Sequence, residues 1–332
     1  MTIRHPADVP QRAADAEPGA ASTPAGPRTW TRRKVLAWTL TGLGAAVTAG
    51  AGGVELVVHD VLPGHQLLNE LDGACAVASM PRAFSPLGPA QSGQYFSPAR
   101  NRTVGYTIAY PPDHGPGDTL PLAIALHAYG GDHNSALAGL TMQQALALHV
   151  NGQPIAPMAM VAADGGGGYW HAHPGDDPMG MLINEIIPMC QALGLGRPPR
   201  PIGTIGISMG GYGAILVAEK HPDSIGAVAA ISPAIWTHYA QARAANPRAF
   251  TSTDDFAAND VIAHAPALAG KAVRVASGDS DPFRPGVTAL TKALPPGTII
   301  DFSKGCHTGP FVSAQQPPSL DLLAAKLTNP TA

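Results

Sequence analysis

Short apolar runs alternate with helical patterns through most of this chain. The runs are apolar at nearly every position, which is typical of strands buried on both faces of a parallel sheet; they are Leu120–Leu126, Pro157–Ala163, Ile202–Ile207, Ile225–Ile231, Ala272–Ala276 and Ile299–Phe302. Helical patterns follow at Ser135–His149, Met179–Leu193, Gly210–His221, Val287–Leu294 and Leu320–Leu327. This alternation predicts an α/β fold with a mostly parallel, doubly wound sheet and helices on both faces.

One domain spanning residues 94–330 accommodates the pattern. It begins with two stretches, Tyr95–Phe96 and Thr103–Tyr110, that predict a β-hairpin. The segment Trp236–Pro266 has no strand pattern, and we expect a helical insertion that packs over the site. Residues 55–93 are an extended lead-in that the pattern does not place.

The N-terminal residues predict an export signal. Residues 1–30 are rich in Ala, Pro and Gly and are expected to be disordered. Residues 31–54 contain Arg32 and Arg33 ahead of an uncharged stretch at 35–54, which resembles a twin-arginine signal. The sequence favours a cleaved signal, with an uncleaved membrane anchor at 35–54 as the alternative. Either one predicts an exported protein: extracellular, periplasmic or held in the cell envelope.

Cysteine count and charge narrow the class further. An exported chain permits a disulfide; among the three cysteines, Cys75 and Cys306 lie in loop-like contexts and form the candidate pair, whereas Cys190 lies in an apolar helical pattern. The formal net charge of −3 provides no basic field for nucleic acid. The class of protein that remains is a globular enzyme or binding domain with a mostly uncharged surface.

The sharpest motif is the segment from Gly206 through Ser208 to Gly213, which follows an apolar strand and opens a helix. In that context G-x-S-x-G forms a nucleophile elbow, because glycines flank a turn too tight for side chains. We therefore expect Ser208 to be a nucleophile, with the backbone N–H of Met209 at the helix start as one oxyanion donor.

An acid and a histidine follow the last two strands. Asp279 and Asp281 follow Ala272–Ala276, and His307 follows Ile299–Phe302. Hydrolases with this elbow order their triad as serine, acid, histidine, so we expect His307 as base and Asp281, with Asp279 as the alternative, as its partner.

Two glycine-containing loops complete the predicted site. After the strand Leu120–Leu126, the loop with Tyr129 should supply the second oxyanion amide, Ala128 being the alternative, while His127 anchors the loop. Residues 164–177 hold five glycines, four of them consecutive, together with His171, His173 and three aspartates. A metal site there is possible in principle, but a serine nucleophile makes it redundant. We expect a pocket wall of Tyr169 and Trp170, with no metal and no cofactor.

These motifs together resemble a known family. The chain combines Asp164 and Tyr169-Trp170-His171 with Glu185-Ile186-Ile187-Pro188, Gly206–Ala214 and Ser232-Pro233. In this it is similar to the esterase D group of α/β hydrolases, which includes S-formylglutathione hydrolases, feruloyl and acetylxylan esterases and mycolyltransferases. The resemblance implies the α/β-hydrolase fold, with Ser208, an acid after the next strand, and His307.

The sequence therefore predicts an exported serine esterase that hydrolyses carboxylic esters through an acyl-enzyme. Its expected substrate is a small-molecule, lipid or sugar ester. Two alternatives use the same scaffold: acyl transfer to a sugar or lipid alcohol, and a non-catalytic cell-surface binding module.

Overall fold

The structure, a computed structural model, describes residues 73–78 and 81–329. The chain divides into two units, Met1–His59 and Asp60–Ala332, and all described residues belong to the second unit. The segments predicted at 1–30 and 31–54 lie outside the described residues. Within the described part of the chain, no helix has both the length and the apolar character that crossing a membrane requires.

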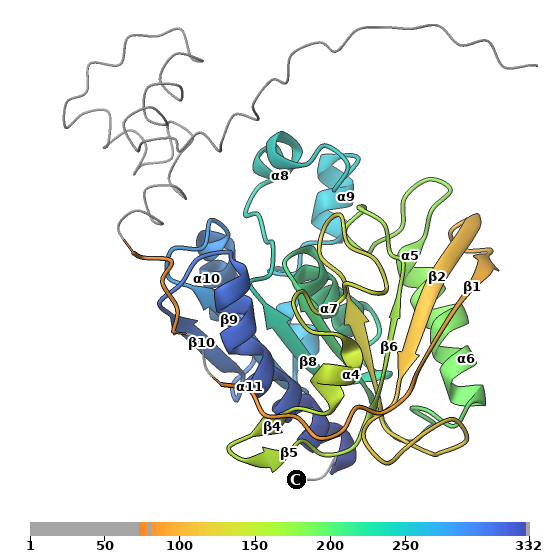
Figure 1. Ribbon diagram of the computed structural model, residues 1–332. Coiled ribbons are helices and arrows are strands. Elements are labelled where there is room, and N and C mark those ends of the chain that lie inside the picture. The colour runs from red at the N-terminus through yellow and green to blue at the C-terminus, as the bar shows by residue number, and fades with distance from the viewer. Residues whose placement is uncertain (1–72, 79–80, 330–332) are drawn as a thin grey trace, which may run out of the picture. The chain divides into compact units, whose positions relative to one another are not determined.

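An eight-stranded sheet forms the centre of the second unit, in the order β1-β2-β6-β3-β7-β8-β9-β10 (Figure 1). β2 pairs antiparallel with β1 and with β6, and the remaining neighbours are parallel. The strands are β1 Ala90–Ser97, β2 Arg102–Ala109, β3 Leu122–Leu126, β6 Ala159–Ala163, β7 Ile202–Ile207, β8 Ile225–Ile231, β9 Ala272–Gly278 and β10 Ile299–Ser303. The predicted α/β fold is confirmed, and its first strand begins at Ala90, before the predicted stretch Tyr95–Phe96.

Helices cover both faces of the sheet. Two buried clusters lie on its opposite sides: one packs against α7 and its neighbours, the other against α4 and α11. Alternate residues of β3 contribute to the two clusters. Leu122, Ile124 and Leu126 face the first cluster, and Ala123 and Ala125 face the second. The helices are α4 Met142–Leu146, α5 Pro178–Met181, α6 Ile187–Ala192, α7 Met209–Lys220, α8 Tyr239–Ala245, α9 Thr253–Ala258, α10 Arg284–Ala293 and α11 Gly309–Thr328.

Several elements differ from their predicted bounds because of local backbone chemistry. The helix expected over Ser135–His149 is reduced to α4, since Ala138 and Gly139 both have positive φ and Thr141 begins the helix anew with a capping box. A small hairpin, β4 His149–Val150 and β5 Gln153–Pro154, follows it. Between α5 and α6 the helix widens into a π-helical turn, Leu182–Ile186, just before Pro188, whose ring would clash with a carbonyl in a regular α-helix.

Helix α11 is more than twice as long as predicted because it continues through Pro317 and Pro318. Proline has no N–H, so Pro317 leaves the carbonyl of Ser313 without its helical partner. The side chain of Arg82 fills this vacancy, since its Nη2 donates to Ser313 O at 2.5 Å and to Gln316 Oε1 at 3.2 Å.

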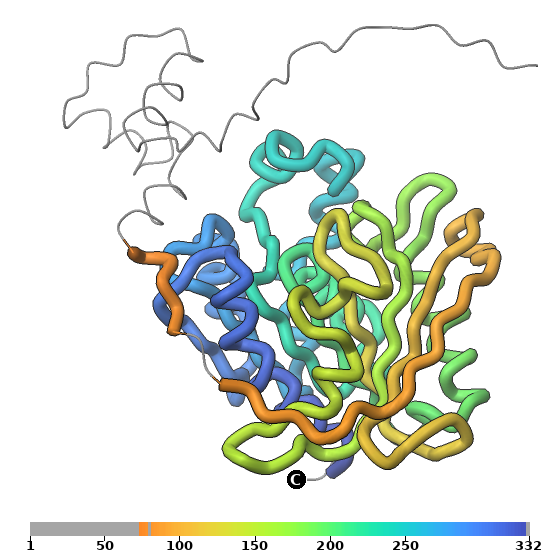
Figure 2. The backbone as a smooth tube through the Cα atoms, in the orientation of Figure 1, coloured from red at the N-terminus to blue at the C-terminus, as the bar shows by residue number. Residues whose placement is uncertain are grey.

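Arg82 belongs to the lead-in, whose described residues, 73–78 and 81–93, run along the domain (Figure 2). Within this segment Ser85 N–H donates to Ala147 O at 2.8 Å, and Ala83 O accepts from His149 N–H at 2.9 Å. In the same segment, Cys75 forms a disulfide with Cys306, 231 positions away. The predicted cysteine pair is therefore present, and Cys190 is a buried free thiol.

Candidate active site

Ser208 lies on a sharp turn between β7 and α7, at the carboxyl edge of the sheet. Its backbone adopts φ +56° and ψ −119°, a sparsely populated conformation. Ser208 N–H donates to Ile231 O at 3.0 Å, and Ser208 O accepts from Ala234 N–H at 3.0 Å, so β8 and the loop after it hold the strained residue. A Cβ at Gly206 would overlap the carbonyl of Gly210, and one at Gly210 would overlap the carbonyl of Leu126. The glycines therefore permit the turn and its close approach to β3.

His307 connects Ser208 to a buried carboxylate. Its Nε2 lies 2.9 Å from Ser208 Oγ, and its Nδ1 lies 3.0 Å and 3.2 Å from the two oxygens of Asp281. The Asp281 side chain is 0 % exposed, and Oδ1 also accepts from Phe283 N–H at 2.9 Å. Asp279 is 57 % exposed and pairs with Arg284 at 3.2 Å. Of the two aspartates, Asp281 is the one that faces His307.

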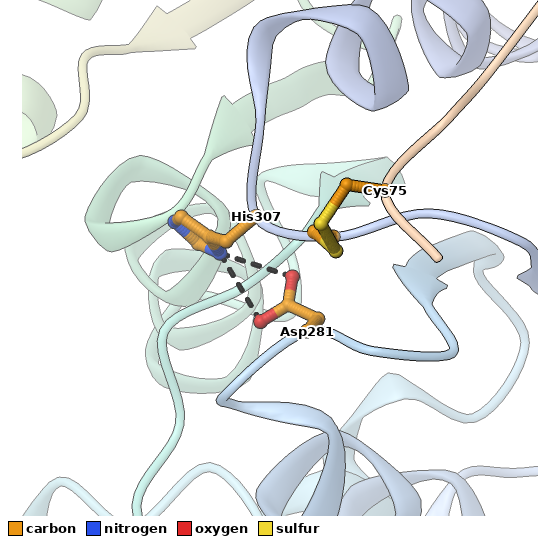
Figure 3. The surroundings of a disulfide bond; sticks show 4 residues. Cys75, Asp281 and His307 are labelled. Atoms are coloured by element: carbon orange, nitrogen blue, oxygen red, sulfur yellow. Dashed lines mark hydrogen bonds and ion pairs between the residues drawn. A yellow bond between two sulfur atoms is a disulfide. The ribbon is translucent and has the colours of Figure 1, made fainter. Parts of the chain in front are cut away.

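The loops that carry Asp281 and His307 are joined to each other. Backbone N–H groups of Asp279 and Ser280 donate to Ser303 O and Gly305 O, both at 2.9 Å. The disulfide lies directly beside this pair, because Cys306 precedes His307 (Figure 3). The lead-in is thus covalently fixed to the loop that positions the imidazole.

The predicted oxyanion donors lie on two segments that touch. Met209 is the first residue of α7, where N–H groups have no partner within the helix. The loop holding Ala128 and Tyr129 follows β3, whose last carbonyl, at Leu126, lies against Gly210. The loop turns back at once, since Gly131 N–H donates to Ala128 O at 3.0 Å. Met209, Ala128 and Tyr129 are therefore at the same edge as Ser208.

His127 fastens the two glycine-containing loops together, in agreement with its expected anchoring role. Its buried Nε2 accepts from Gly165 N–H at 2.9 Å, and its Nδ1 lies 2.8 Å from Ala128 O. Because Nε2 accepts, Nδ1 carries the hydrogen. Burial lowers the pKa of His127, which favours this neutral form.

The predicted pocket wall of Tyr169 and Trp170 is wrong. Trp170 is 0 % exposed and Tyr169 is 4 % exposed. The indole fills the space that a Cβ at Gly165 or Gly213 would need, so it packs in the core against the nucleophile helix. Tyr169 lies within an aromatic cluster, 4.9 Å from the ring of Trp236. Burial raises the pKa of its hydroxyl.

Sequence analysis missed the aromatic rings that do approach the site. The ring of Phe283 lies 5.2 Å from that of His307, and Trp236 lies 5.6 Å from Phe283. Tyr129 is 56 % exposed beside Gly167. Phe283 could have been inferred because it comes two residues after Asp281, whereas Trp236 depends on how the helical insertion folds back.

Comparison with protein families identifies the chain. The family model Esterase, described as "Putative esterase", matches residues 97–293, more than half of the chain. The chain belongs to this esterase family. It is a carboxylic ester hydrolase, and the resemblance inferred from its motifs is confirmed. A comparison with curated proteins finds no match.

Solved structures share the fold of this esterase. A ferulic acid esterase superposes with a TM-score of 0.57 at 16 % identity, covering 72 % of this chain and 99 % of its own. An S-formylglutathione hydrolase from Agrobacterium tumefaciens gives 0.55 at 16 % identity, covering 75 % and 99 %. Mycobacterium tuberculosis MPT51 gives 0.52 at 19 % identity, covering 74 % and 99 %. All three are similar in architecture across the described domain.

Proposed function

We propose that this ester hydrolase works through a Ser208–His307–Asp281 triad and an acyl-enzyme. The observation that carries the proposal is the imidazole of His307, which lies within hydrogen-bond distance of Ser208 Oγ on one side and of the Asp281 carboxylate on the other. A serine hydroxyl is a weak nucleophile without such a base.

The reaction follows from this geometry. As Ser208 Oγ attacks the ester carbonyl carbon, its proton passes to His307 Nε2, and Asp281 stabilises the resulting imidazolium. Collapse of the tetrahedral intermediate breaks the bond to the alcohol oxygen, which takes the proton from His307. Water then repeats the sequence on the acyl group, giving the carboxylic acid and free Ser208.

The negative charge that develops on the carbonyl oxygen needs donors already in place. The N–H of Met209 at the start of α7 is the first donor of the proposal, and the N–H of Tyr129, or of Ala128, is the second. No step requires a cofactor or a metal. The substrate class of the proposal is a small-molecule, lipid or sugar ester.

We also propose that the enzyme is exported. The disulfide between Cys75 and Cys306 supports this, because structural disulfides persist in oxidising compartments. Arg32 and Arg33 supply the export motif. Replacing both arginines with lysine should retain the protein in the cytoplasm, which cell fractionation measures; unchanged export would contradict the twin-arginine route.

A fluorophosphonate probe tests the triad directly. It should label the purified wild type at Ser208, and Ser208→Ala should lose both labelling and hydrolysis of p-nitrophenyl esters. Ser280→Ala is the matched control, a serine on the Asp281 loop that should keep both. A folded Ser208→Ala enzyme with wild-type turnover would refute the proposal.

A further inference from the structure

Two histidines and an aspartate meet at a place that the proposed mechanism does not use. One ligand atom from each of His171, His173 and Asp255 lies within 4.8 Å of the others. The histidines belong to the glycine-rich loop, and Asp255 belongs to α9 in the helical insertion. Sequence reasoning could weigh only the aspartates nearby in the chain, Asp176 and Asp177.

Those nearby aspartates have other partners. Asp176 makes a two-point ion pair with the buried guanidinium of Arg100, at 2.7 Å and 2.9 Å. Asp177 caps α5, since its Oδ1 accepts from Gly180 N–H at 2.7 Å. The carboxylate that joins the histidines therefore comes from α9, far along the chain in the helical insertion.

Hydrogen bonds select the tautomer that each imidazole adopts in its neutral form. His171 Nε2 lies 2.7 Å from Ala249 O, and His173 Nε2 lies 2.7 Å from Gly168 O. Carbonyl oxygens only accept, so each Nε2 carries hydrogen and each neutral ring has its lone pair on Nδ1. This is the arrangement in which backbone carbonyls orient metal-binding histidines.

The lone pair of His171 faces other acceptors. Its Nδ1 lies 3.5 Å from Asp255 Oδ1 and 3.2 Å from Ala172 O. The one donor group described beside it is the amide of Asn259, which also bonds Oδ1 and the backbone carbonyl of Asp255. Two amide hydrogens thus face three acceptors.

We propose that His171, His173 and Asp255 bind a divalent transition metal of the zinc type, with water as the fourth ligand. Two imidazoles and a carboxylate are a donor set that Zn²⁺ accepts. Bonds of about 2.0–2.1 Å place tetrahedral ligand atoms roughly 3.3 Å apart. The ligand atoms of His171 and Asp255 are already near this spacing. The imidazole of His173 would have to move closer to them when the metal binds.

This metal would clamp the helical insertion to the glycine-rich loop. His171 stacks on Phe250 with ring centroids 5.2 Å apart and an interplanar angle of 13°. Phe250 packs on Trp236, which contacts Phe283 beside His307. The ion is structural in this proposal, since it orders the aromatic layer without touching the reacting ester.

Metal titration of untagged protein tests the site without any activity assay. After EDTA treatment and dialysis, Co²⁺ serves as the spectroscopic probe and Zn²⁺ as its competitor. We expect one equivalent of Co²⁺ with the intense visible absorption of a four-coordinate ion, displaced by Zn²⁺. His173→Ala and Asp255→Asn should each weaken binding at least tenfold, whereas His238→Ala, an exposed histidine of the same insertion, should not.

A second readout guards against general effects of the substitutions. Zn²⁺ should slow tryptic cleavage after Arg243 and Arg248 in the wild type but not in His173→Ala, whose near-UV circular dichroism in EDTA should match that of the wild type. Weak octahedral binding that persists in both ligand variants would place the ion on other histidines and overturn the proposal. Absence of Co²⁺ binding to the wild type would overturn it too.

Discussion

Glu219 predicts an unusual dependence of stability on pH. It lies near the end of α7, is 6 % exposed, and within the described part of the chain neither carboxyl oxygen has a hydrogen-bond partner. Burial raises its pKa from 4.5 to about 9, with Asp260 adding to the rise and Lys220 opposing it. At neutral pH the folded protein therefore holds Glu219 as the neutral acid.

The sign and size follow from proton linkage. Above pH 4.5 the unfolded chain releases a proton that the folded chain keeps, so stability falls as pH rises toward 9. Each pH unit in this window costs about 1.4 kcal/mol, which gives roughly 4 kcal/mol between pH 5 and pH 8. The side chain in Glu219→Gln is uncharged at both pH 5 and pH 8, so this variant should not lose that stability as the pH rises. Relative to wild type, the variant should gain about 4 kcal/mol between pH 5 and pH 8.

Guanidinium chloride unfolding of the disulfide-intact protein at the two pH values measures this gain. The difference between variant and wild type isolates Glu219, because buried histidines contribute equally to both. Asp113→Asn removes an exposed carboxylate and should leave the wild-type pH dependence unchanged. Parallel curves for Glu219→Gln and wild type would show that Glu219 is ionised in the folded state and would refute the reasoning.

Three further predictions concern the site. Asp281→Asn should lower kcat for p-nitrophenyl esters by roughly 10³–10⁴-fold, whereas Asp279→Asn should retain most of it; similar losses would contradict the assignment. Gly210→Ala should lower the free energy of unfolding by about 3 kcal/mol, because the added methyl group overlaps Leu126 O. An unchanged midpoint of denaturant unfolding would contradict this. Cys75→Ser should lower the free energy of unfolding by about 2–5 kcal/mol. Dithiothreitol should lower the thermal midpoint of the wild type but not that of this variant.

The strands and the Ser208 elbow were predictable because their signals are local. Buried runs such as Ile202–Ile207 and the glycines around Ser208 depend on the chain immediately beside them. The order of serine, acid and histidine was enough to select His307. This order alone does not distinguish Asp281 from Asp279. The distinction depends on which carboxylate is buried beside His307 and which forms an exposed ion pair with Arg284.

The predictions that were wrong or incomplete concern features that tertiary packing determines. An aromatic residue in a glycine-rich loop is typical of a pocket wall, but Gly165 and Gly213 leave a core space that the ring of Trp170 fills. The first half of α11 was missed because two prolines usually end a helix, and here Arg82 meets the carbonyl that Pro317 leaves free. The cluster of His171 and His173 needed Asp255, whose position is set by the fold of the helical insertion.

The lead-in has a practical consequence for anyone who shortens this protein. The family match begins at residue 97, which invites an expression boundary there. Cutting at that point would delete nearly all of β1, remove the guanidinium that Ser313 depends on, and turn Cys306 into an unpaired thiol next to His307. A boundary upstream of Cys75 keeps these supports, so for this esterase the smallest useful fragment is larger than the family signature.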